Sequence, residues 1–98
     1  MKRLYPRRIR DKFFLSRLLE AYLAHLEASE LQVSLHMLAY NSNIPAAVFE
    51  RMRQLHKTPD DATGIRTSDY HILFSNIMFH YPTIRIWMQK DGTVFFEM

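Results

Sequence analysis

Apolar residues recur every three or four positions through most of the chain, which is the spacing of one face of an α-helix. The first stripe begins at Phe14 and predicts a helix that starts within residues 7–11 and ends within residues 27–29. Pro6 cannot lie inside a helix, so residues 1–6 are expected to precede this helix as an arm. The stripe comprises Phe14, Leu15, Leu18, Leu19, Tyr22 and Leu26.

Two shorter helices are predicted next, joined by a turn at residues 41–43. Ser29 with Gln32 forms a candidate capping box for the second helix. The Asn-Ser-Asn sequence of the turn favours a helix end, because short polar side chains bond to nearby backbone. Pro45 suits the first position of the third helix, which should run to about His56. The inward positions are Leu31, Leu35, Leu38 and Ala39 in the second helix and Val48, Phe49, Met52 and Leu55 in the third.

A fourth helix is predicted after a loop that contains Pro59 and Gly64. Thr67 or Ser68 can cap its start, and Pro82 requires that it end before that residue. Its apolar stripe comprises Tyr70, Leu73, Phe74, Ile77, Met78 and Tyr81.

The period of the apolar pattern changes to two in residues 83–98, which predicts a β-hairpin. A three-residue loop at residues 90–92, with Gly92 in the left-handed conformation, gives both faces a consistent character, whereas a two-residue loop mixes them. One face then holds the apolar pairs Met88 with Val94, Ile86 with Phe96, and Ile84 with Met98. The other face pairs Gln89 with Thr93, Trp87 with Phe95, and Arg85 with Glu97. An isolated hairpin is marginal, so this one is expected to lie on the helices or to pair with another chain.

The chain has 98 residues, of which 48% are hydrophobic, and this suits one domain with one core. We predict a mainly α domain over residues 1–98, in which four helices include a helix-turn-helix within residues 31–57 and precede a C-terminal β-hairpin. The absence of cysteine excludes disulfides, cysteine-ligated zinc and thiol nucleophiles. No apolar run of the signal-peptide or membrane-spanning type occurs, so we expect a cytoplasmic protein with no membrane association.

Charge is concentrated at the start of the chain, although the formal net charge is only +3. Seven of the 13 basic residues lie in the first 17 positions, and residues 1–10 form a basic N-terminal arm. Such a cluster fits contacts to phosphates, while a solvated terminus is an equally simple interpretation. Membrane-surface binding is a weaker alternative, because the following apolar stripe can be used entirely by a core. The seven residues are Lys2, Arg3, Arg7, Arg8, Arg10, Lys12 and Arg17.

Residues 31–57 match the packing pattern of a DNA-reading helix-turn-helix, in which two short helices pack steeply and leave the second free to enter the major groove. Ser42 departs from the pattern, because an aliphatic residue is usual at its position. Any two amphipathic helices around an Asn-rich turn match several of these positions, so an ordinary packed pair is the alternative. The matching residues are Leu38, Ala39, Asn43, Ile44, Phe49 and Met52.

The outward face of the third helix, over residues 45–57, carries the predicted DNA contacts. Arg51 can bond to guanine and Gln54 to adenine, and Glu50 can accept from cytosine or orient a neighbouring arginine. Arg53 and Lys57 are better placed for phosphates. The arm is expected to add phosphate contacts from Arg7, Arg8 and Arg10. Small residues, Ala46 and Ala47, permit close approach at the start of the helix. The sequence therefore predicts a DNA-binding transcription regulator, either a homodimer or a subunit of a hetero-oligomeric complex.

The segment from about Leu26 to Pro82 also resembles the helical region of FlhC-type flagellar master regulators and of small related regulators. The similar features are LHMLAYNSNIPAAVFERMRQL, a following Pro/Gly loop, and TSDY at the start of the next helix. The resemblance implies a transcription regulator that works on DNA in a multi-subunit complex, with residues 45–57 involved. FlhC-type proteins also carry a four-cysteine zinc module, and zinc binding does not carry over to a chain without cysteine.

Two other function classes compete with this hypothesis. A protein-interaction module, such as a small adaptor, antiactivator or chaperone, would use Trp87 and Phe95 as a partner interface, since aromatic residues dominate interface hot spots. Self-association is favoured over a foreign partner, because two-fold dimers are the commonest assembly. No pair of histidines has the i, i+4 spacing of metal ligands, and no Ser-His-Asp set has a recognisable nucleophile turn. A small-toxin type of ribonuclease needs no local motif, but we expect no enzyme, catalytic residue, metal or cofactor.

Overall fold

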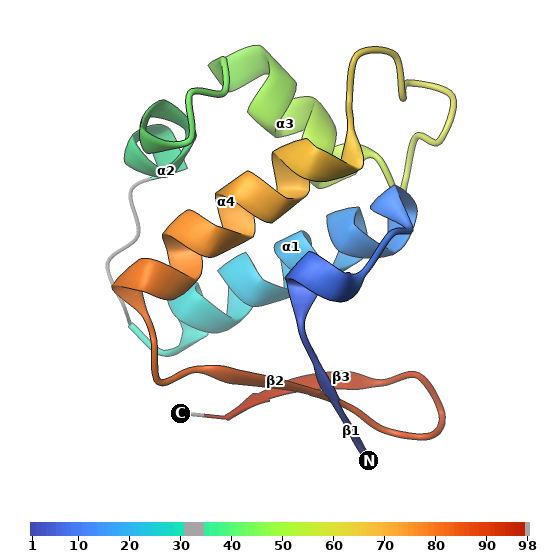
Figure 1. Ribbon diagram of the computed structural model, residues 1–98, viewed down its shortest axis with the longest axis vertical. Helices are drawn as coiled ribbons and strands as arrows, with labels where there is room; N and C mark the ends of the chain where they lie inside the picture. Colours follow the sequence, from blue (N-terminus) through green and yellow to red (C-terminus); the bar gives the residue numbers. More distant parts are fainter. Residues whose placement is uncertain (31–34, 98) are drawn as a thin grey trace.

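The computed structural model of the protein describes residues 1–30 and 35–97. Within these residues it contains four α-helices and a three-stranded antiparallel sheet, which confirms the mainly α class and adds one strand to the predicted hairpin (Figure 1). The elements in chain order are β1 (Lys2–Leu4), the 3-10 helix η1 (Pro6–Arg8), α1 (Lys12–Ala28), α2 (Leu35–Asn41), α3 (Ala46–Gln54), α4 (Thr67–His80), β2 (Arg85–Met88) and β3 (Val94–Glu97).

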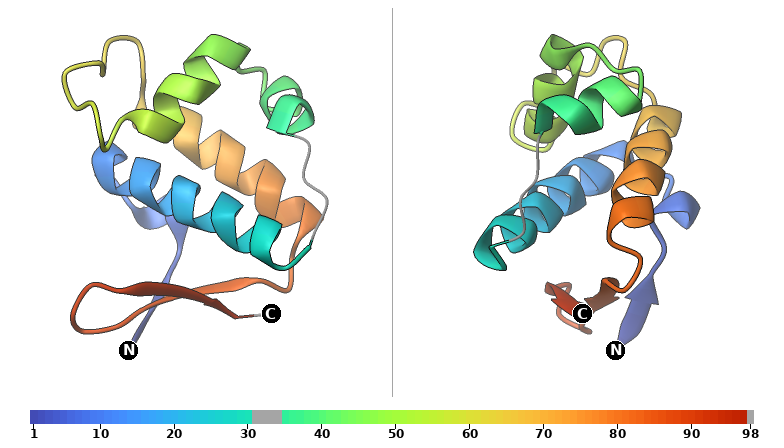
Figure 2. Two further views of the ribbon diagram at one scale, coloured as in Figure 1. Left: turned by 180° about the vertical axis from the view of Figure 1, so that it is seen from behind. Right: turned by 90° about the vertical axis from the view of Figure 1, so that its left-hand side faces the viewer.

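The domain is built in three levels along its longest dimension of 33 Å. Helices α1 and α4 pack together in the middle, α2 and α3 lie at one end, and the sheet lies at the other end (Figures 1 and 2). The helices therefore cover one face of the sheet only. This arrangement separates the surface of α3 from the strands.

Helix α1 begins one residue later than the pattern predicts, because residues 6–8 form the separate turn η1. Asp11 caps the helix, and its carboxylate accepts hydrogen bonds from the backbone N–H of Phe13 at 2.9 Å and of Phe14 at 3.4 Å. The helix ends at Ala28, inside the predicted range.

The core lies between α1, α4 and the inner face of the sheet. Tyr22 is at its centre, and its ring lies edge-on to Phe74 at 6.1 Å and to Phe96 at 5.2 Å between centroids. The stripes predicted for α1 and α4 are buried, except that Phe14, Met78 and Tyr81 are half-buried. In α3, Val48 is half-buried. The buried residues of α3 and the sheet include Phe49, Met52, Leu55, Leu4, Ile84 and Ile86.

Some predicted features lie outside the described residues: Leu31 and Gln32 of the second helix, with the capping box that needs Gln32, the side chain of Leu35, and Met98 of the hairpin. The predicted caps of α4 are wrong. Arg66 occupies the cap position, and its backbone N–H donates to the Asp69 carboxylate at 3.0 Å. Thr67 instead donates its hydroxyl proton to the carbonyl of Arg10 at 3.2 Å, which ties the start of α4 to the N-terminal segment.

The register of the hairpin is confirmed. Trp87 pairs with Phe95 and Arg85 with Glu97, and the remaining pairs of β2 and β3 follow in step. Gly92 has a φ of +90°, and its N–H donates to the carbonyl of Gln89 at 3.0 Å. The Asp91 carboxylate accepts the N–H of Thr93 at 2.9 Å, and this hydrogen bond lowers the pKa of Asp91.

The basic arm expected over residues 1–10 is folded onto the domain. β1 pairs antiparallel with β2, with Arg3 opposite Trp87 and Leu4 opposite Ile86. The pairing satisfies backbone groups on one side of β2 that would otherwise form an unpaired sheet edge. Leu4 points into the core, where it is 7% exposed, and this burial anchors the strand.

Candidate nucleic-acid interface

The turn between α2 and α3 is fixed by Asn43, which has a φ of +57°. Its N–H donates to the carbonyl of Tyr40 at 3.0 Å, and the N–H of Ile44 donates to the carbonyl of Ala39 at 2.9 Å. This pair of bonds commonly ends a helix at a left-handed residue, and Asn tolerates that conformation better than most side chains. Pro45 follows as the cap residue of α3, one position before the first helical position predicted for it, and residues 42–45 join the two helices.

Helices α2 and α3 pack through the predicted inward positions. Those positions are buried: Leu38, Ala39, Ile44, Phe49 and Met52. Ser42, the one departure from the aliphatic pattern, is also buried, at 5% exposed. Its hydroxyl oxygen lies 2.8 Å from the side-chain nitrogen of Asn76 in α4, which donates to it. A hydrogen bond thus replaces the usual apolar contact. Both a DNA-reading pair and an ordinary packed pair require this burial.

The first turn of α3 is open to solvent. Ala46, Ala47 and Glu50 are exposed, and the two alanines present only methyl groups. Gln54, at the other end of the helix, is half-buried. The start of α3 therefore offers the closest approach to another molecule.

Arg51 lies at the surface of α3, half-buried, but its side chain is not free. Its guanidinium turns to the loop after α3, with Nη2 3.2 Å from one carboxylate oxygen of Asp61 and Nε 3.3 Å from the other. Nη2 also donates to the backbone carbonyls of Asp61, at 3.2 Å, and of Thr63. Nε and Nη2 of Arg51 are used within the free protein, so Arg51 joins the loop to the helix.

The other cations of α3 and of the residues that follow it are paired with carboxylates. Arg53 contacts Glu50 at 3.3 Å. This ion pair fits one of the two roles predicted for Glu50, which is to orient a neighbouring arginine. Lys57 contacts Glu20 of α1 at 3.2 Å. Exposed ion pairs of this kind contribute about 0–1 kcal/mol, so a phosphate can displace either carboxylate. The charge on this face is nearly balanced in the free protein.

The N-terminal cations are arranged differently. In the part of the chain that the structure describes, none of the seven lies in an ion pair, whereas Arg51, Arg53, Lys57, Arg66 and Arg85 all do. Asp11 is the only acidic residue before Glu20, and its carboxylate caps α1. The start of the chain is therefore a surface of uncompensated positive charge.

Aromatic rings hold several of these cations at the surface. The guanidinium carbons of Arg3 and Arg8 lie 5.0 and 4.7 Å from the ring centroid of Tyr5. Arg17 lies over Phe14 at 5.2 Å. Cation–π contacts at exposed sites contribute about 0.5–1 kcal/mol, enough to bias the side chains without consuming their hydrogen-bond donors.

The N-terminal cations do not flank α3 as an arm, because β1 lies at the opposite end of the molecule (Figure 1). Two of them lie closer to it. Lys12 donates to the carbonyl of Ile65 at 3.3 Å, and the carbonyl of Arg10 accepts the Thr67 hydroxyl. Both therefore lie beside the loop that connects α3 to α4.

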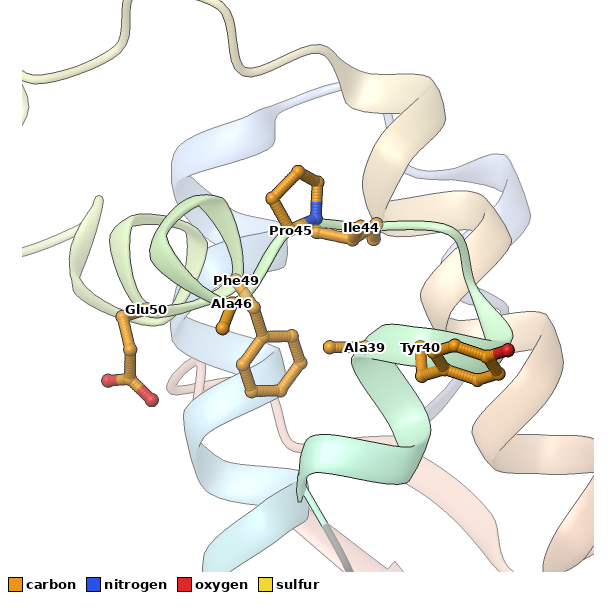
Figure 3. Close-up of a pocket in the computed structure, with 7 residues that line it drawn as sticks. All are labelled: Ala39, Tyr40, Ile44, Pro45, Ala46, Phe49 and Glu50. Atoms are coloured by element: carbon orange, nitrogen blue, oxygen red, sulfur yellow. The ribbon is translucent and has the colours of Figure 1, made fainter.

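An apolar hollow of about 460 Å³ lies between α2 and the start of α3 (Figure 3). Phe49 points from α3 toward Ala39 of α2, and Tyr40, 79% exposed, stands beside them. No local sequence pattern predicts this hollow, because it depends on the angle between two helices; an aromatic residue at position 40, beside the turn, is the local signal for it. Its lining is completed by Ile44, Pro45, Ala46 and Glu50.

The Trp87–Phe95 pair lies on the sheet face turned away from the helices. Both side chains are half-buried, and neither packs against the core, unlike Met88, Val94 and Phe96 beside them. The sequence analysis placed this pair outward, and the structure agrees.

Histidine and hydroxyl groups meet in one buried cluster that joins α1, α3 and α4. The Ser16 hydroxyl donates to the carbonyl of Met52 at 2.6 Å, and the Tyr70 hydroxyl donates to the same carbonyl at 2.8 Å. Nδ1 of His56 lies 2.9 Å from the Ser16 oxygen. Burial raises the pKa of Tyr70 to about 12, although a side-chain hydrogen bond with Ser16 lowers this pKa by a smaller amount. The shared carbonyl gives the cluster a structural role.

Within residues 1–30 and 35–97, no group of three or more His, Cys, Asp or Glu side chains could hold a metal ion. Among the helices so described, none is long and apolar enough to cross a bilayer. No family model, no curated protein and no solved structure matches the chain, so the resemblance to FlhC-type regulators stays a prediction.

Proposed function

We propose that the protein is a DNA-binding transcription regulator in which α2 presents α3 to the major groove. The observation that carries this proposal is the position of two unpaired cations, Arg10 and Lys12, beside the loop that follows α3. The cations outside the N-terminal segment of the described surface, apart from Lys90, are neutralised in ion pairs. An uncompensated cationic surface favours a polyanion, because bound phosphates release condensed counterions. The exposed first turn of α3 supplies an element of the size that the major groove admits.

The contacts proposed for α3 differ from those that the sequence predicted. Arg51 is removed as a base reader, since the loop holds its guanidinium. Ala46 and Ala47 can contact thymine methyl groups, and Gln54 can bond to adenine. Arg53 and Lys57 supply phosphate contacts after they exchange their carboxylate partners.

Arg10 and Lys12 are the proposed N-terminal contacts to the duplex backbone, because they lie beside the loop that follows α3. Arg7 and Arg8 belong to η1, which packs against α4 nearer the sheet. We propose that they contribute less to duplex binding than Arg10 does.

The test is binding of the purified chain to a pool of random duplexes across a salt series, with recovery of the bound sequences. Gln54→Ala should relax the preference at one base position, at a cost of about 1–3 kcal/mol. The double variant Arg10→Ala, Lys12→Ala should weaken binding to all sequences alike. It should also reduce the slope of log affinity against log salt concentration by about 2. Lys90→Ala, which removes an unpaired cation at the hairpin tip, is the matched control. No enriched motif, and equal losses on every sequence for Gln54→Ala, would reject the reading role of α3.

The proposal includes a homodimer or a hetero-oligomeric complex. A two-fold dimer would place two α3 helices about 34 Å apart, which is one turn of the duplex. The sequences that it selects from the random pool would then contain palindromic half-sites. Light scattering with and without the selected duplex separates a dimer from a monomer that requires a further subunit.

A protein-interaction module is the second candidate, and the hollow beside Tyr40 favours it, because exposed aromatic side chains at apolar depressions commonly anchor partners (Figure 3). Tyr40→Asp should then abolish self-association while the salt dependence of DNA binding is retained. An unchanged molecular mass for this variant would remove the candidate in its self-associating form.

A further inference from the structure

The sheet face turned away from the helices combines aromatic rings with unpaired cations. Arg3, Trp87 and Phe95 form one row across the three strands, in that order. Tyr5 follows β1 in extended backbone, and its ring lies beneath the Arg3 guanidinium at 5.0 Å. We call this surface, with Arg8 over the Tyr5 ring, the outer sheet face. Figure 2 shows that α1 and α4 cover only the opposite side of the strands.

The apolar residues needed for the core come from the other face. Leu4 and Ile86 are buried there, and Phe96 packs against the core. Trp87 and Phe95 are therefore not required to complete the interior. Among the described residues, no other ring stacks on either of them, and no cation lies over them. Both side chains are half-buried and the Trp87 indole nitrogen is buried without a hydrogen-bond partner among the described residues, so only the exposed part of each ring is open to a ligand.

The charges on this face are one-sided. Arg85 is neutralised by Glu97 at 3.7 Å, but Arg3 and Arg8 have no carboxylate partner within the described chain. The Tyr5 ring contacts both guanidinium groups, of which Arg3 lies in the row with Trp87, and their donors stay free for an anion. Positive charge thus borders a strip of ring surface.

We infer that the outer sheet face binds single-stranded nucleic acid. Splayed bases stack on Trp87 and Phe95, which neighbouring strands hold about 4.8 Å apart at the backbone. Arg3 and Arg8 contact the phosphates that connect those bases. A duplex cannot use this surface, because its base faces are already stacked inside the helix.

The experiment uses Trp87 as its own reporter, because it is the only tryptophan of the chain. An oligonucleotide of about ten thymidines, a length within the usual site size, should quench the fluorescence of the full chain, and added salt should reverse the effect. Trp87→Leu and Phe95→Leu keep an apolar residue in the strand but remove the ring. With a labelled oligonucleotide, each should bind between about five- and a hundred-fold more weakly, whereas Trp87→Phe should retain binding.

Two controls separate this site from folding defects and from α3. Phe79→Leu removes a ring that is 81% exposed on α4, and it should leave the affinity unchanged. Ala47→Glu should abolish duplex selection by α3 without affecting the oligonucleotide. Thermal melts of all variants establish that they are folded. Failure of duplex selection alone therefore rejects the function proposed for α3 and leaves the outer sheet face supported.

Three results would overturn the inference. The first is oligonucleotide binding that Trp87→Leu and Phe95→Leu leave unchanged. The second is a blue shift of the Trp87 fluorescence emission when phosphatidylserine vesicles are added, with no change of fluorescence when the oligonucleotide is added. This result would assign the face to membranes. The third is a change of molecular mass in Trp87→Leu with unchanged oligonucleotide affinity, which would assign it to a protein interface.

Discussion

The Arg51 guanidinium lies 3.2 Å from the Asp61 carboxylate, ten residues further along the chain. The contact joins α3 to the loop that leads into α4, and it is reinforced by two backbone carbonyls of that loop. An arginine whose spacing suggested base recognition is therefore a structural residue in the free protein.

Arg51→Ala and Asp61→Ala should each lower the free energy of unfolding by about 1 kcal/mol and expose the loop at residues 58–66 to proteases. The double variant should cost little more than either single variant, because both remove the same contact. Denaturant unfolding and timed proteolysis measure the two effects, with Arg66→Ala as a control cation. A changed base preference in Arg51→Ala with normal loop protection would return the residue to DNA reading.

The partly buried hydrogen bond between Ser42 and Asn76 should contribute more to the stability of the fold than fully exposed hydrogen bonds do. Asn76→Ala leaves the Ser42 hydroxyl without a partner and should cost about 1–3 kcal/mol of unfolding free energy. Ser42→Val combined with Asn76→Leu should recover most of the loss, since it restores the apolar contact usual at this turn. Ser75→Ala, which removes a hydroxyl bonded within α4, is the control. A double variant no better than Asn76→Ala would contradict this account.

Two buried tyrosines should respond oppositely to removal of their hydroxyl groups. The Tyr70 hydroxyl donates to Met52, so Tyr70→Phe should lower the free energy of unfolding by about 1 kcal/mol. The Tyr22 hydroxyl is buried without a hydrogen-bond partner among the described residues, so Tyr22→Phe should be neutral or stabilising. Urea unfolding of the two variants side by side provides the comparison, and equal losses would refute the assignment.

The same tyrosines should make the protein sensitive to alkali. Burial raises the pKa of both Tyr22 and Tyr70 from 10.0 to about 12, with a smaller contribution from Tyr81 to the first. A raised pKa in the folded state means that unfolding releases protons, so stability is retained below pH 10 and falls as the pH rises toward 12. Absorbance at 295 nm should show these two groups ionising together with the loss of helical circular dichroism. In Tyr22→Phe the decline should be shallower.

The elements that the sequence predicted correctly are those specified by neighbouring residues. The stripe of α1 and the Asn43 turn depend on short spacings, and the hairpin register depends on one left-handed glycine and on the alternation around it. β1 has three residues, too few for a period to be visible, and it forms because β2 offers it an edge. Its prediction needed tertiary information.

The candidate site was predicted only in outline for the same reason. Ala46, Ala47 and Glu50 are exposed as expected, because the helical period alone decides their direction. The orientation of Arg51 depends on an irregular loop, and no local pattern reports where Asp61 will lie. The grouping of Arg3 with Trp87 likewise requires the pairing of strands from the two ends of the chain.

That pairing sets the order in which a growing chain becomes functional. Residues Lys2–Leu4 have no hydrogen-bonding neighbour until Arg85–Met88 have been synthesised, so the first strand to leave the ribosome is the last to be placed. A nascent chain halted after α4 would still carry Arg3 on a segment without its partner strand. Arg3 can meet Trp87 only after the last strands exist, so the binding inferred for the sheet would be acquired with the last residues rather than the first.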